Sequence, residues 1–149
     1  MMIPPACRNR GTKLAIAAAT VALLAAQEPA VLTPGKAIER QIAGGESHDY
    51  RLALAPGEYA GIVVEQRGID VVVQLLDANG RVAAEFDSES RKQGRELAGL
   101  VADAATDYQV RVAPKYPKEA AASYEIRLAE VRPATDQERF LFEKSSDRG

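Results

Sequence analysis

The chain of 149 residues is long enough for one domain with its own hydrophobic core and further segments at its ends. Tryptophan is absent and aromatic residues make up only 5% of the sequence, so aliphatic side chains must form most of that core. The formal net charge of −2 argues against a nucleic-acid partner, because binding to phosphates needs a basic face.

Residues 1–26 have the pattern of a secretory signal peptide. Three basic residues precede an uncharged apolar stretch at residues 14–26, which is the length of a signal-peptide core rather than of a membrane span. We therefore expect a signal helix and export to the periplasm or the extracellular space. Leu24 stands where cleavage favours a small residue, so an uncleaved segment is an alternative, and it is the one membrane contact that we expect. Cys7 lies in this segment, which leaves no cysteine for a disulfide or a metal site in the exported part.

Residues 27–35 contain two prolines and are predicted to be an extended linker. From residue 36 to residue 132, short apolar segments alternate with turn residues, as in antiparallel sandwiches. The predicted strands are residues 35–42, 48–54, 58–66, 70–76, 81–87, 96–102, 106–113 and 123–131. The sixth, residues 96–102, is ambiguous between a strand and a helical turn, because Leu and Ala dominate it. We predict an all-β fold, an antiparallel jelly-roll-like β-sandwich of about eight strands.

The most informative segment is residues 68–80. Val and Ile favour the pleated surface of a strand, and Asn79-Gly80 favours the positive φ angles of a tight turn. The segment predicts a central strand followed by a hairpin. It also suggests a weak calcium site, because calcium binds carboxylate and amide oxygens. The candidate ligands at the ends of these adjacent strands are Asp70, Asp77, Asn79 and Asp87.

Residues 133–149 are predicted to be a helical stub or the start of a downstream domain. Thr135 and Glu138 form a capping box, which marks the beginning of a helix. Such a short helix is marginal in isolation. Either it docks on the sandwich or it begins a further domain. Phe140, Leu141 and Phe142 would form an exposed apolar patch and are our candidate partner-binding residues.

The residues give little support for catalysis. His48 is the single histidine and opens a predicted strand beside a turn, so neither a nucleophile–base pair nor a zinc site can be assembled. The carboxylates fall at outward positions of alternating strands, so a solvated sheet face explains them better than a pair of catalytic acids does. Stacking of sugars on aromatic rings is disfavoured, because only Tyr59 and Tyr116 are candidates for exposed rings. We therefore predict no catalytic and no cofactor-binding residues.

Residues 44–50, 55–59, 70–80, 86–88 and 106–112 together suggest a family. In their order and spacing they resemble the bacterial pre-peptidase C-terminal (PPC) type domain, a jelly-roll β-sandwich. The likeness covers about residues 32–135 and is greatest to the version found at the N-terminus of exported proteins, ahead of tetratricopeptide repeats (TPR) and often a caspase-like CHAT protease domain. The sequence departs from the pattern at Thr106-Asp107, where the family usually has a glycine before the tyrosine.

The resemblance implies a non-catalytic accessory module that aids folding, secretion or targeting of attached domains. Its partner would be another protein or a downstream domain of the same polypeptide. A calcium- or glycan-binding module of a secreted protein is the alternative.

Overall fold

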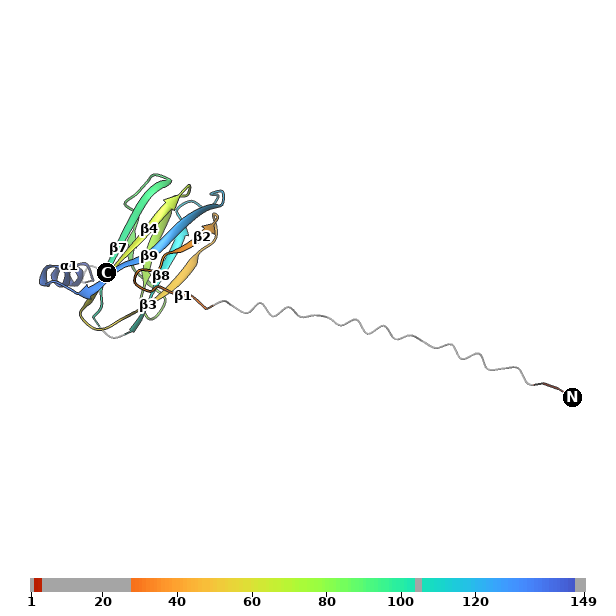
Figure 1. Ribbon diagram of the computed structural model, residues 1–149, viewed down its shortest axis with the longest axis horizontal. Helices are drawn as coiled ribbons and strands as arrows, with labels where there is room; N and C mark the ends of the chain where they lie inside the picture. Colours follow the sequence, from red (N-terminus) through yellow and green to blue (C-terminus); the bar gives the residue numbers. More distant parts are fainter. Residues whose placement is uncertain (1, 4–27, 104–105, 147–149) are drawn as a thin grey trace.

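Nine strands and one helix form the described part of the computed structural model, which covers residues 2–3, 28–103 and 106–146 (Figure 1). The elements are β1 (Ala30–Val31), β2 (Ile38–Ile42), β3 (His48–Leu54), β4 (Glu58–Arg67), β5 (Val71–Leu76), β6 (Val82–Phe86), β7 (Gln93–Val101), β8 (Thr106–Pro114), β9 (Ala122–Pro133) and α1 (Asp136–Ser146). The predicted all-β sandwich with a short C-terminal helix is confirmed. The predicted signal helix lies outside the described residues. Within them, no helix has the length and apolarity needed to cross a bilayer.

Two sheets face each other. One has the strand order β1-β3-β8-β5-β6, and the other has the order β2-β9-β4-β7. All neighbouring strands are antiparallel except β1 and β3, which are parallel. Consecutive strands such as β3 and β4 lie in different sheets, so the chain crosses repeatedly between the layers. Strands β1, β2, β6 and β7 therefore form the four edges.

The strand limits agree closely with the alternation of the sequence. Strand β3 coincides with its predicted range, and the ambiguous segment at residues 96–102 belongs to a strand, β7. The predicted linker needs a correction, because Ala30–Val31 pairs with β3 and the Leu32 side chain is 3% exposed. Burial of Leu32 against the sandwich makes this proline-containing segment part of the fold rather than a free tether.

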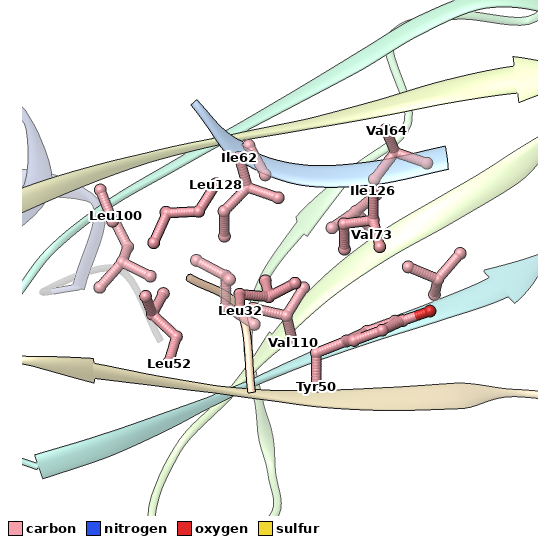
Figure 2. Packing of buried hydrophobic residues seen from close by; sticks show 14 of the residues in the cluster. Leu32, Tyr50, Leu52, Ile62, Val64, Val73, Leu100, Val110, Ile126 and Leu128 are labelled. Carbon is pink, nitrogen blue, oxygen red and sulfur yellow. The ribbon is translucent and has the colours of Figure 1, made fainter. Parts of the chain in front are cut away.

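The core fills the space between the two sheets, and Figure 2 shows its aliphatic side chains meeting from both layers. Alternation places every second residue of each strand inward, as the pattern of β3 predicted. Tyr50 and Tyr124 are fully buried, as expected, whereas Tyr108 is only half-buried. The alternation of residues 81–87 puts Val82 on the same face as Ala84 and Phe86, which predicts that it points inward. Val82 is instead 51% exposed, because it lies on the edge strand β6.

The turn between β5 and β6 differs from the tight Asn-Gly turn that we expected. Gly80 has a φ of 77°, whereas no non-glycine residue in the described chain has a positive φ. The Gly80 N–H donates to the Asp77 carbonyl at 3.0 Å, and the Asp77 N–H donates to the Arg81 carbonyl at 2.8 Å. A longer loop with one glycine in the left-handed region therefore closes the hairpin. Strand β5 lies inside its sheet, between β8 and β6.

Candidate functional site

Helix α1 begins with the predicted capping box. The Glu138 N–H donates to Thr135 Oγ1 at 3.2 Å, and the Thr135 N–H donates to Glu138 Oε2 at 2.8 Å. These reciprocal bonds satisfy backbone donors that a helix start otherwise leaves free. Just before the helix, Ala134 is buried and its N–H donates to the Gly57 carbonyl at 2.8 Å. The start of α1 is therefore attached to the sandwich.

A second attachment uses Glu138 again. The Arg132 guanidinium donates to both Glu138 oxygens, at 2.9 and 2.7 Å, in a bidentate pair. The hydrogen bonds from Arg132 are the main reason that the pKa of Glu138 is lowered to about 2. The same guanidinium lies 4.5 Å from the centre of the Tyr59 ring, in a cation–π contact. Strand β9 thus holds the helix through one arginine, which we call the Arg132 clamp (Arg132, Glu138 and Tyr59).

Two glycines make room for the clamp. Gly61 on β4 and Gly99 on β7 are cross-strand partners. A Cβ atom added at Gly99 would lie 2.9 Å from the Tyr59 hydroxyl, and one added at Gly61 would lie 3.5 Å from Tyr59 Cε1. The Tyr59 ring therefore occupies the space that side chains would take at this pair. Strand glycines often mark such close approaches.

An apolar groove of about 360 Å³ lies beside the clamp, between the edge strands of the two sheets and α1. Residues 84–86 of β6 and residues 99–101 of β7 line it, together with Leu141 and Phe142 of the helix. Phe142 packs against the core. Phe140 and Leu141 are 62% and 56% exposed. The structure therefore divides the three candidate partner-binding residues: Phe142 anchors the helix, and the other two face solvent.

The four candidate calcium ligands do not come together. Asp70 and Asp77 flank the six residues of β5, which separates their Cα atoms by about 23 Å at the rise of a strand. Asp77 Oδ1 accepts the N–H groups of Asn79 and Arg81 and so stabilises the hairpin loop. Asp87 pairs with Lys115 at 2.8 Å. Across the described ranges, no group of three or more His, Cys, Asp or Glu side chains is placed to hold a metal ion.

Three polar side chains are buried near the Asp70 end of the sandwich: Gln66, Asp70 and Glu96. Glu96 accepts hydrogen bonds from the N–H groups of Ser88 and Glu89, so it organises the loop that precedes β7. Gln66 bridges the Val71 N–H and the Arg91 carbonyl. Gln66 and Glu96 were not among the predicted site residues, although a polar residue at an inward position of an alternating strand is a detectable signal.

Asp70 is the least satisfied member of this cluster. It is 3% exposed, and its Oδ1 has no hydrogen-bond partner among the described residues. Burial raises the pKa of Asp70, and the nearby ammonium of Lys115 opposes that shift. Lys115, which also pairs with Asp87, therefore links the two carboxylates at this end of the sandwich electrostatically.

His48 lies at a separate polar pocket, which Arg40 and Asp49 also line. Its Nδ1 is 2.7 Å from the Tyr124 hydroxyl. Both Asp49 oxygens are held by Arg111, at 2.8 and 2.9 Å, so this carboxylate does not orient the histidine. Desolvation and the charge of Arg40 lower the pKa of His48. The arrangement connects the histidine to the core rather than to a nucleophile.

Comparison with solved structures identifies similar folds. The pre-peptidase C-terminal domain of a collagenase from Bacillus anthracis matches with a TM-score of 0.54 at 19% identity, over 71% of this chain and 96% of that one. PliG, a periplasmic inhibitor of g-type lysozyme, matches from Aeromonas hydrophila (TM-score 0.53, 8% identity, 70% of this chain and 100% of that one) and from Salmonella Typhimurium (0.51, 11%, 71% and 100%). No family model matches the chain, and no curated protein matches it in sequence. At these identities the likeness establishes a PPC-like fold and nothing further.

Proposed function

We propose that this chain is a non-catalytic interaction module of an exported protein, and that α1 with its adjoining groove is the surface that binds a protein partner. One observation carries the proposal. The Arg132 clamp holds α1 in place while Phe140 and Leu141 stay 62% and 56% exposed beside an apolar groove. Exposed apolar surface of this kind is characteristic of contact sites.

Other observations support the same proposal. The signal-like residues 1–26 favour export, and the single histidine leaves few residues for hydrolytic chemistry. The structural neighbours include a domain attached to a collagenase and an inhibitor of lysozyme, which itself acts on a protein. By analogy in fold alone, a binding role fits this architecture. The resemblance to PPC-type domains that precede TPR and CHAT regions makes a downstream domain of the same polypeptide one source of the partner.

A photo-crosslinking experiment tests the proposal. A photoreactive amino acid replaces Leu141 on α1 in one variant and Tyr116 in a control variant, and both are produced in an exporting bacterial host. Tyr116 is 52% exposed, about as much as Leu141, but it lies outside the groove. We expect a defined protein adduct only from position 141. Equal adducts from both positions, or none from either, would contradict the proposed surface. The coding sequence downstream of residue 149 tests the TPR/CHAT association separately, because it would encode the repeats or the protease domain.

A further inference from the structure

The four edge strands differ in how well they are protected. Exposed sheet edges invite pairing with other chains, so proteins shorten them, charge them or cover them. Strand β1 has only two residues, β2 carries Glu39 and Arg40, and β6 is a five-residue strand with Glu85 near its end. Strand β7 is nine residues long and is the longest of the four. Its edge therefore needs separate consideration.

A loop covers the first half of β7, and α1 lies beside residues 99–101 across the groove. Gly94 lies under the Glu89 side chain, since a Cβ added there would be 2.5 Å from Glu89 Oε2. The Glu96 carboxylate holds the same loop through Ser88 and Glu89. From residue 97 to residue 101 the sequence is Leu-Ala-Gly-Leu-Val, without a charge or a proline, and Leu97 is 61% exposed. We call residues 97–101 the open edge.

The register shows which backbone groups the open edge presents. The Ala102 N–H donates to the Glu58 carbonyl at 2.8 Å, and the Gly68 N–H donates to the Lys92 carbonyl at 2.8 Å. Hydrogen-bonded and non-bonded pairs alternate along an antiparallel ladder, and the β4–β7 register has no irregularity. Even-numbered residues of β7 therefore bond to β4. The N–H and C=O groups of Leu97, Gly99 and Val101 point away from it, and no other strand of the described residues pairs with them.

The groove adjoins this row of donors and acceptors. Residues 99–101 line it from one side and residues 84–86 from the other, so it runs beside the open edge. The charged side chains that line it are Glu85 and Glu138, both acidic, and Glu138 already pairs with Arg132. Glu85 accepts a hydrogen bond from Gln74 and pairs with no cation among the described residues. The groove therefore suits a segment with apolar side chains and one basic residue.

The geometry points to a specific occupant: an extended segment of a partner polypeptide that adds a strand to the open edge of β7, places an aliphatic side chain in the groove, and sets a Lys or Arg against Glu85. Main-chain pairing supplies the affinity, and the side chains at alternate positions supply the specificity. This inference deepens the proposed function, on which it rests, by naming the form and chemistry of the partner. It requires extended backbone rather than a docked helix.

The experiment selects binders from a displayed library of random peptides on the intact chain, and then measures synthetic copies of the selected peptides. Leu97→Pro is the decisive variant, because it removes one outward N–H and leaves the ladder to β4 unbroken. Leu97→Thr is the matched control, which keeps that N–H while also removing the exposed leucine. We expect selected peptides with alternating aliphatic residues and a basic residue. Their affinity for Leu97→Pro should be lower than their affinity for Leu97→Thr by about tenfold or more, as loss of a backbone hydrogen bond predicts. Circular dichroism verifies that both variants stay folded.

Peptides methylated on alternate backbone nitrogens provide an independent reading, because methylation in one register should abolish binding and in the other should not. If Phe140→Ser weakens binding while Leu97→Pro and methylation do not, strand addition is wrong and the proposed surface stands. If substitutions in the groove and on α1 weaken the binding of none of the selected peptides, both proposals are wrong. If the chain instead self-associates and Leu97→Pro makes it monomeric, the occupant is a second copy and the inferred partner is overturned.

Discussion

The hydroxyl oxygens of Tyr50 and Tyr124 lie 2.5 Å apart in the core, and they join a strand of one sheet to a strand of the other. Tyr50 belongs to β3 and Tyr124 to β9. The Tyr124 hydroxyl also contacts His48 Nδ1 at 2.7 Å, so a short chain of polar groups leads from the core to the surface. Buried hydroxyls need such partners, because leaving one unpaired is costly.

Replacing Tyr124 should therefore cost more than replacing Tyr50. Tyr124→Phe leaves the Tyr50 hydroxyl without its partner in the core, and we expect a loss of about 1–3 kcal/mol in the free energy of unfolding. Tyr50→Phe leaves Tyr124 bonded to His48 and should cost about 0.5–1.5 kcal/mol. Urea denaturation measures both. The double variant should cost less than the sum of the two, and strict additivity would show that the two hydroxyls are not coupled.

The His48 contact predicts a dependence of stability on pH. Because the pKa of His48 is lowered in the folded state, the unfolded chain binds the proton more readily. The contribution of His48 is fully present above its unfolded pKa of about 6.5 and is lost as the pH falls through the lower folded value. We expect the urea midpoint to fall between about pH 7.5 and about pH 5.5. His48→Asn, which does not titrate, should fall less, and an equal fall in both proteins would assign the effect to other groups.

The Arg132 clamp should control α1 without controlling the sandwich. Glu138→Gln removes the charge of the bidentate pair, so we expect faster amide exchange in α1 and little change in β4 and β9. Since the pKa of Glu138 is lowered to about 2, its contribution is present above the ordinary carboxyl range and is lost as the pH falls toward 2. Asp136→Asn is the control, because this exposed carboxylate lies 3.9 Å from Arg139 and outside the clamp. Equal exchange in both variants would contradict the role of Arg132.

Gly99 should tolerate alanine less well than Gly61. A Cβ at Gly99 meets the Tyr59 hydroxyl at 2.9 Å, whereas a Cβ at Gly61 first meets the flexible Glu130 side chain at 3.1 Å. Gly99→Ala must therefore move the ring on which Arg132 stacks, and we expect a loss of about 1–3 kcal/mol together with faster exchange in α1. Gly61→Ala should cost less. Thermal denaturation of the two variants provides the comparison, and the reverse order would show that Tyr59 adapts to the added carbon.

Calcium should not stabilise the chain. Lys115 pairs with Asp87 and acts on the pKa of Asp70, and Asp77 is used by the hairpin loop. Melting curves with and without millimolar calcium should therefore coincide. A calcium-dependent rise in the melting temperature that disappears in Asp70→Asn would revive the original candidate site. Asp77→Asn is the control for the opposite end of β5.

Local patterns in the sequence predicted most of the architecture. Alternation of apolar and polar residues located strands such as β3 and β9, because each has one face toward the core. Thr135 and Glu138 predicted the start of α1, because a capping box acts within one turn. The weak points were segments decided by distant contacts. Burial of Leu32 makes the predicted linker part of the sandwich. Val82 is exposed because its strand lies at the edge of a sheet.

The sequence by itself determined the β-sandwich class, the strand boundaries and the helix start, since each depends on neighbours along the chain. Only the tertiary structure decided which side chains share a site. It separated Asp70 from Asp77 by the length of β5, placed Tyr59 over Gly99, and assigned Phe142 to the core while Phe140 faces solvent. It also placed the second half of β7 at a sheet edge, beside α1 and the groove. These outcomes depend on sheet order and register, which are set by packing between residues far apart in the sequence.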